Sequence, residues 1–248
     1  MHDETKPRKP REESEDSASS TPLQQLVDMG SSTTTNRRGT IHCLTIVGQI
    51  EGHSVLPSTA KSTKYEHVMP LLASIEQSDE VDGLLLLLNT VGGDIEAGLG
   101  IAELIAGMRK PTVSLVLGGG HSIGVPLAVS AKVTMIVPSA SMTIHPVRMN
   151  GTMIAAPQTY QYFDRIQERI VKFVTRNSRI SEKKFMELML QAKDMAADIG
   201  SVVYGEEAVS LGLMDQIGTL SQALDCLYTM IEEEKERRSR QTEGEEGS

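Results

Sequence analysis

Residues 81–94 read Val-Asp-Gly-Leu-Leu-Leu-Leu-Leu-Asn-Thr-Val-Gly-Gly-Asp, and this stretch decides the class of fold. Its five consecutive leucines, Leu84 to Leu88, form a short apolar run that is typical of a strand buried on both faces. Gly92 and Gly93 predict a turn after the strand, and Asp94 predicts the start of a helix. A doubly buried strand that leads into a helix indicates a parallel sheet covered by helices.

The same order of elements recurs directly downstream. Residues 112–117 predict a second strand, Gly118 to Gly120 predict a second turn, and a short helix is expected to begin near Ser122. Strand, glycine turn and helix, twice in succession, predict right-handed βαβ units and a mostly parallel α/β sheet. Further strands are expected at 41–49, 133–137 and 141–144, and further helices at 65–77, 94–108, 157–177, 181–191, 206–212 and 220–234.

Both ends of the chain have a different composition from its middle. Residues 1–39 and 235–248 mix charges of both signs with serine, threonine, proline or glycine, and their apolar clusters are short. Such segments bury too little apolar surface to offset their ordering entropy. We therefore expect one folded domain over residues 40–234, flanked by two disordered polar tails.

Composition excludes several classes of function. The net charge of −9 argues against non-specific nucleic-acid binding, which needs a clustered positive surface. Cys43 and Cys226 are too few for a disulfide scaffold or a zinc cluster, so a reducing compartment is expected. The chain has no run of 18 apolar residues and no apolar signal-peptide core near its start, so we expect a cytoplasmic protein.

The first candidate for a functional site is the glycine pair after the leucine strand. Backbone N–H groups at Gly92 and Gly93, next to the positive end of the following helix, favour an anion or a developing oxyanion. The alternative is an ordinary tight turn between strand and helix. The stretch lacks the G-x-G-x-x-G pattern of dinucleotide sites, and no Gly-Lys-Ser or Gly-Lys-Thr predicts a P-loop, so ATP-independent chemistry is expected.

The second stretch is Gly-Gly-Gly-His-Ser-Ile-Gly at residues 118–124. A serine at a glycine-rich corner between strand and helix holds its hydroxyl above the sheet with room for a substrate, as in a nucleophile elbow. The alternative is that Ser122 caps the following helix. Three preceding glycines favour the nucleophile, because they cost backbone entropy and mark close backbone approach.

A base for this serine is present in the third stretch, Thr-Ile-His-Pro at residues 143–146. His145 alone has the pattern of a structural histidine, but a Ser–His pair makes a hydroxyl nucleophilic near pH 7. A triad also needs a carboxylate, for which spacing alone does not choose among Asp164, Asp194, Asp198 and Asp215. The histidines show no H-E-x-x-H or Cys/His spacing, so neither a metal nor another cofactor is expected.

Taken together, these stretches resemble the Clp-type serine peptidases, peptidase family S14, over about residues 40–220. Residues 89–93 are similar to the family's Asn-Ser-Pro-Gly-Gly turn, and 118–124 to its nucleophile segment. Residues 142–146 are similar to its Met-Ile-His-Gln-Pro segment, and 205–215 to its Glu-Ala-x-x-Tyr-Gly-Leu-x-Asp ending. The resemblance implies a ClpP/crotonase-type fold with ββα units and a helical handle at about 157–192.

The resemblance also implies roles for individual residues. Ser122 is expected to be the nucleophile and His145 the general base, with the amides of Gly93 and Ile123 forming the oxyanion hole. Asp198 is the expected acid because the family's aspartate lies just before the Glu-Ala segment, and Asp194 is the alternative. The implied partners are a peptide or preprotein substrate and further copies of the chain in a ring.

Departures from the common family pattern point to one branch of it. Thr90-Val91 replaces Ser-Pro, His121 replaces a small residue, and residues 49–64 are longer than usual. With residues 41–53, these features resemble a translocation-enhancing branch, which implies help with preprotein passage and contact with the secretion machinery or the inner face of the membrane. The alternatives are a scaffold with a lapsed site that binds preproteins or translocation machinery, and a crotonase-type acyl-CoA enzyme.

Overall fold

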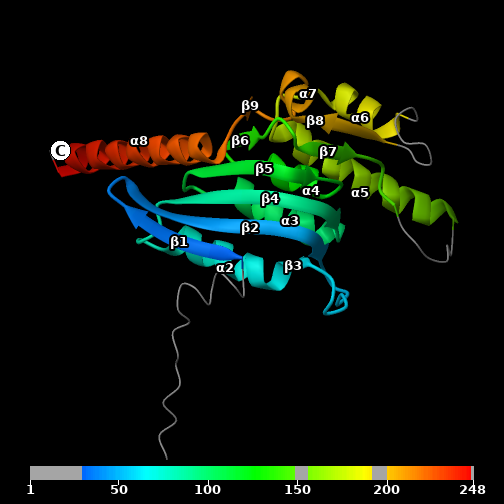
Figure 1. Cartoon of the computed structure of the whole chain (residues 1–248), viewed down its shortest axis with the longest axis horizontal. Helices are drawn as coiled ribbons and strands as arrows, with labels where there is room; N and C mark the ends of the chain where they lie inside the picture. The colour runs from blue at the N-terminus through cyan, green and yellow to red at the C-terminus, as the bar shows by residue number, and fades with distance from the viewer. Residues whose placement is uncertain (1–29, 149–155, 192–199, 247–248) are drawn as a thin grey trace, which may run out of the picture.

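Parallel strands form the centre of the protein, for which the computed structural model describes residues 30–148, 156–191 and 200–246 (Figure 1). The central order is β1-β2-β4-β5-β6-β9, and neighbours from β2 to β9 run parallel. These strands are β2 (Gly39–Glu51), β4 (Gly83–Gly93), β5 (Thr112–Gly120), β6 (Val133–Ile136) and β9 (Gln216–Ile217). The predicted α/β class with a mostly parallel sheet is confirmed.

Shorter strands extend this sheet at its margins. The strand β3 (Ser62–Lys64) runs parallel to the end of β2. The strand β7 (Ser141–Ile144) meets β5 at a single register pair, Gly119 with Ser141, and runs antiparallel to β8 (Ser201–Tyr204). Because β7 ends directly before His145, this small pairing places the histidine beside the end of β5.

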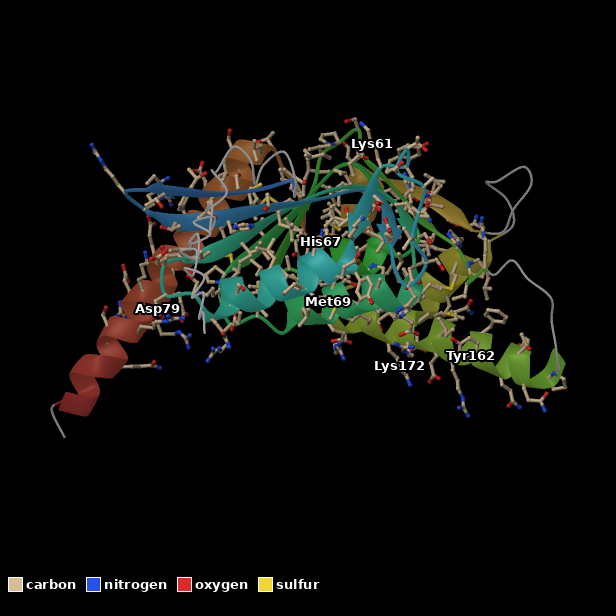
Figure 2. All side chains as sticks on the ribbon, turned by 90° about the horizontal axis from the view of Figure 1, so that it is seen from below. Lys61, His67, Met69, Asp79, Tyr162 and Lys172 are labelled. Carbon is tan, nitrogen blue, oxygen red and sulfur yellow. The ribbon has the colours of Figure 1, made fainter. Side chains whose placement is uncertain are left out.

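The leucine run is buried on both faces, as predicted. Side chains alternate along a strand, so Leu84, Leu86 and Leu88 belong to one hydrophobic cluster and Leu85 to the other. The first cluster is covered by α2 (Tyr65–Gln77), α3 (Ile95–Ala106), α4 (Gly124–Ala128), α5 (Ala156–Arg176) and α6 (Glu182–Leu190). Figure 2 shows α2, with His67 and Met69, and α5, with Tyr162 and Lys172, on this side.

One long helix, α8 (Leu220–Glu246), covers part of the opposite face and projects beyond the sheet (Figure 1). The helix continues past Glu234, where the sequence predicted its end. Ion pairs one turn apart stabilise this polar segment, since Arg238 lies 2.8 Å from Glu234 and Arg240 lies 3.3 Å from Glu236. Part of the predicted C-terminal tail is therefore helical.

The start of the sheet also differs from the prediction. Residues Ser31–Asn36, assigned to a polar tail, form β1 and pair antiparallel with β2 in the register Thr33 to His42. Threonine is β-branched and suits a strand, but the segment has no apolar alternation that marks it in the sequence. Residues 1–29 of the predicted tail lie outside the described residues.

The glycines at the ends of the central strands were also predicted differently. Gly92 and Gly93 belong to β4, and Gly118 to Gly120 belong to β5, instead of forming turns. The chain turns one step later, at residues 121–123, and then enters α4. A final short helix, α7 (Gly205–Ser210), follows β8. Of the helices within 30–148, 156–191 and 200–246, none has the length and apolarity that crossing a bilayer requires.

Candidate active site

A cavity of about 210 Å³ opens at the carboxyl ends of β4 and β5. Four of the five predicted site residues line it: Gly93, Ser122, Ile123 and His145. In parallel sheets this edge is where ligands bind, because the loops that follow the strands converge there. The fifth predicted residue, Asp198, lies outside the described residues.

Ser122 occupies the sharp corner between β5 and α4. Its φ of 58° is in the left-handed region, which costs a non-glycine residue free energy and is found at functional sites. Its amide donates to the carbonyl of Thr143 at 2.8 Å, and its carbonyl accepts from the amide of Val125 at 3.0 Å. Backbone hydrogen bonds therefore hold the corner in a strained conformation.

The hydroxyl of Ser122 is available for chemistry. The helix α4 begins at Gly124, and no side chain caps it, so the structure does not support a capping role for this serine. In the described part of the chain the Ser122 hydroxyl makes no hydrogen bond, while residues 120–124 spell Gly-His-Ser-Ile-Gly, the pattern of a nucleophile elbow.

Gly92 makes room for this serine. A β-carbon built on Gly92 would lie 2.6 Å from the β-carbon of Ser122, and the φ of Gly92 is 89°. Any larger residue would push the end of β4 away from the corner. Gly92 therefore allows the end of β4 to approach the serine corner closely.

The predicted oxyanion hole consists of the amides of Gly93 and Ile123. The amide of Asp94 donates to the carbonyl of Ile50 on β2 at 3.0 Å. The preceding residue, Gly93, lines the cavity together with Ser122. On the other side, the amide of Ile123 donates to no carbonyl among the described residues.

Thr90 holds the glycine end of β4 in position from a fully buried site. Its hydroxyl donates to the carbonyl of Gly48 at 2.7 Å and accepts from the amide of Gly92 at 3.0 Å. Its own carbonyl accepts from the amide of His121 at 3.1 Å. One residue thus connects β2, the end of β4 and the serine corner, although the sequence singled it out only as a departure from the family pattern.

His145 is half-buried at the end of β7 and faces the same cavity. Its Nδ1 lies 2.7 Å from the carbonyl oxygen of Pro146. Within the described residues no hydrogen bond joins its ring to Ser122 Oγ. Such bonds are often long in unliganded enzymes and tighten when a substrate binds. The observation that connects the two residues is that both line the same cavity.

The chain that carries the predicted acid resumes beside the histidine. A β-carbon built on Gly200 would lie 2.8 Å from the β-carbon of His145, and the Gly200 amide donates to Gln191 at 2.8 Å. The described residues Gln191 and Gly200, which flank the segment with Asp194 and Asp198, therefore lie close to each other, and Gly200 lies against the histidine.

The other two candidate carboxylates are placed elsewhere. Asp215 accepts from the amide and hydroxyl of Thr134, both at 2.9 Å, and pairs with Arg179 at 2.6 Å. Asp164 is exposed on α5. Asp215 stabilises the β6–β9 region, and neither residue lines the cavity.

The remaining wall of the cavity is mostly apolar. Arg148 is its cationic member, and the apolar side chains are Ile95, Val125, Ile144, Val147, Ile170, Phe185 and Met189. The cavity would thus accept an apolar side chain next to the serine. Across the described ranges no three His, Cys, Asp or Glu side chains gather in an arrangement that could hold a metal ion.

Comparison with known proteins places the chain among related sequences. The model of the Clp protease family matches residues 38–221. The translocation-enhancing protein TepA of Halalkalibacterium halodurans is 55 % identical over 195 residues, which cover 79 % of this chain and 76 % of that protein. The putative protease MJ0651 of Methanocaldococcus jannaschii is 26 % identical over 211 residues, which cover 71 % of this chain and 64 % of that protein.

Proposed function

Because this chain belongs to the Clp protease family, we propose that it is a serine endopeptidase that hydrolyses small or unfolded peptides. One observation carries the proposal: Ser122, strained at a φ of 58°, shares a cavity with His145. The proposed triad consists of Ser122, His145 and Asp198.

In this reaction His145 takes the hydroxyl proton of Ser122 through Nε2, and Ser122 Oγ attacks the peptide carbonyl. The amides of Gly93 and Ile123 stabilise the negative oxygen of the tetrahedral intermediate. The imidazolium then gives its proton to the leaving amine, and Asp198 compensates its positive charge. Water, activated by His145 in the same way, hydrolyses the acyl-enzyme.

The cavity also supports a preference among substrates. Ile123, Val125 and Phe185 line it beside Ser122, so an apolar side chain is expected on the residue whose carbonyl is attacked. Burying such a side chain contributes roughly 1.5–3 kcal/mol. Unfolded polypeptides expose such residues, whereas folded proteins bury most of them.

We further propose that the peptidase aids the passage of secretory preproteins across the cytoplasmic membrane, by clearing signal peptides or jammed peptides. The support is the 55 % identity to a protein named for enhancing translocation. A homo-oligomeric ring is the proposed assembly. Contact with the secretion machinery or the membrane surface would then be peripheral.

The test of the peptidase is fluorophosphonate labelling of the assembled protein, read by intact mass, with wild type and Ser122→Ala side by side. An activated serine attacks the phosphorus and expels fluoride, so we expect one adduct on the wild type and none on the variant. An unlabelled wild type, or equal labelling of both proteins, would overturn the proposal.

The test of the translocation role is secretion of a preprotein in cells that lack the endogenous protein. We expect wild type to restore secretion and Ser122→Ala to leave it impaired at equal expression. Full rescue by the variant would overturn a peptidase role in secretion and favour the scaffold alternative.

A further inference from the structure

His121, the residue before the nucleophile, makes a contact that the mechanism above does not use. Its Nδ1 lies 2.8 Å from the hydroxyl oxygen of Thr143 on β7. The ring fits into a notch at Gly119, where a β-carbon would lie 2.5 Å from Nε2. A residue without a side chain at position 119 therefore leaves the space that the ring of His121 occupies.

Thr143 makes a second bond to the same corner. Its carbonyl oxygen accepts from the amide of Ser122 at 2.8 Å. Two successive residues of the corner thus bond to Thr143: His121 to its side chain and Ser122 to its backbone carbonyl. His145 lies two residues further along the chain, at the end of that strand.

Little else in the sheet fixes β7 against β5. The two strands share a single register pair, Gly119 with Ser141, whereas β4 and β5 share six. The separation of Ser122 from His145 therefore depends strongly on the bonds of Thr143.

We propose that His121 and Thr143 form a positioning pair that sets the separation and orientation of Ser122 and His145. This inference rests on the proposed peptidase function. Neither residue of the pair touches the reacting atoms. They act through the serine corner and through β7.

The chemistry of the two side chains fits this role. Burial lowers the pKa of His121 below its usual range, so its ring is neutral at pH 7 and carries one N–H group and one lone pair. A threonine hydroxyl both donates and accepts, so it is compatible with either tautomer. A small residue at position 121 could not span the distance from the corner to β7.

The experiment measures fluorophosphonate inactivation and separates the inhibitor affinity, KI, from the rate constant of the chemical step, kinact. Thr143→Val removes the hydroxyl without changing the shape, and His121→Leu removes the ring nitrogen. We expect kinact to fall roughly 10- to 100-fold in each, the range found for supporting residues, with KI within about 3-fold.

Conservative variants separate positioning from simple loss of stability. Thr143→Ser keeps the hydroxyl and His121→Asn keeps a polar atom near Nδ1, so both should recover most of kinact. The double variant His121→Leu with Thr143→Val should lose no more than the worse single variant, because the pair acts as a unit. Thr175→Val is the matched control, since its hydroxyl bonds to Val171 within α5 at 2.9 Å and it should react like wild type.

The outcomes distinguish this inference from the function on which it rests. Wild-type kinact in both Thr143→Val and His121→Leu overturns the positioning pair and leaves the peptidase intact. Additive losses in the double variant, or no recovery in Thr143→Ser and His121→Asn, also overturn it. A wild type that does not react overturns the peptidase itself, and the positioning pair with it.

Discussion

The Nδ1 atom of His145 lies 2.7 Å from the carbonyl oxygen of Pro146, the next residue in the chain. A carbonyl oxygen only accepts hydrogen bonds, so Nδ1 carries the proton and Nε2 keeps its lone pair. This is the tautomer that a general base needs. The chain itself therefore selects the reactive form of the ring, through a neutral group that cannot balance the charge of an imidazolium.

From this relationship we predict a moderate effect of removing the acid. Asp198→Asn should lower kcat roughly 10²-fold, less than the roughly 10⁴-fold loss that follows when the wrong tautomer is populated, because Pro146 still selects the tautomer. Asp194→Asn is the matched control and should keep kcat within about 3-fold. Peptide hydrolysis by both purified variants tests this, and the reverse order of the two losses would reassign the acid to Asp194.

Thr90 should support both stability and activity. Thr90→Val removes a buried hydroxyl that bonds to Gly48 and Gly92, so each partner loses its bond at a cost of about 1–3 kcal/mol. We expect a lower urea midpoint and slower fluorophosphonate labelling, because Gly92 precedes Gly93, whose amide is the proposed oxyanion donor. Thr90→Ser keeps the hydroxyl and should be close to wild type in both measurements; unaltered behaviour of Thr90→Val would contradict this role.

Substitution by alanine should change the stability of the protein in opposite directions at Gly93 in β4 and at Gly100 in α3. A β-carbon on Gly93 would lie 2.2 Å from the Ile50 carbonyl at a φ of 153°, so Gly93→Ala should be destabilised and unreactive toward fluorophosphonate. A β-carbon on Gly100, inside α3, meets nothing within 4 Å. Gly100→Ala should therefore stabilise the protein by up to about 1 kcal/mol. Thermal unfolding of both variants checks the contrast, which equal shifts would refute.

Stability should fall in mild acid because of buried histidines. Burial lowers the pKa of His42, whose side chain is bonded through Nδ1 to Thr33 at 2.8 Å. In the unfolded chain a histidine has a pKa of about 6.5. His42 therefore binds a proton at a higher pH in the unfolded chain than in the folded one. The free energy of unfolding therefore decreases as pH falls below about 6.5, by at most about 1.4 kcal/mol per pH unit for one histidine.

The measurement is urea unfolding at several values between pH 7.5 and pH 5, for wild type and His42→Asn. The variant should show a shallower decline, since it removes one of the groups with a lowered pKa. Part of the decline should remain, because burial lowers the pKa of His121 in the same direction. An identical slope in both proteins would show that His42 does not contribute.

Strong local patterns were enough to predict much of the fold. The leucine run at 84–88 predicted a strand buried on both faces, and the helix predicted over 65–77 has those bounds in the structure. β1 and the end of α8 were predicted wrongly, because a threonine-rich edge strand and a helix stabilised by ion pairs have little apolar periodicity. The strand β1 is held by its pairing with β2, and the end of α8 is stabilised by ion pairs within the helix.

By itself, the sequence determined the alternation of strands and helices, the glycines at the strand ends, and the identity of Ser122 and His145 as candidates. These features depend on side-chain period and backbone freedom, which are local properties. Only the tertiary structure decided that Thr90 bonds to Gly92 at the end of β4, that Thr143 bonds to His121, and that Gly200 lies against His145. These contacts join residues far apart in the chain, and their distances follow from strand register and packing, which no local pattern encodes.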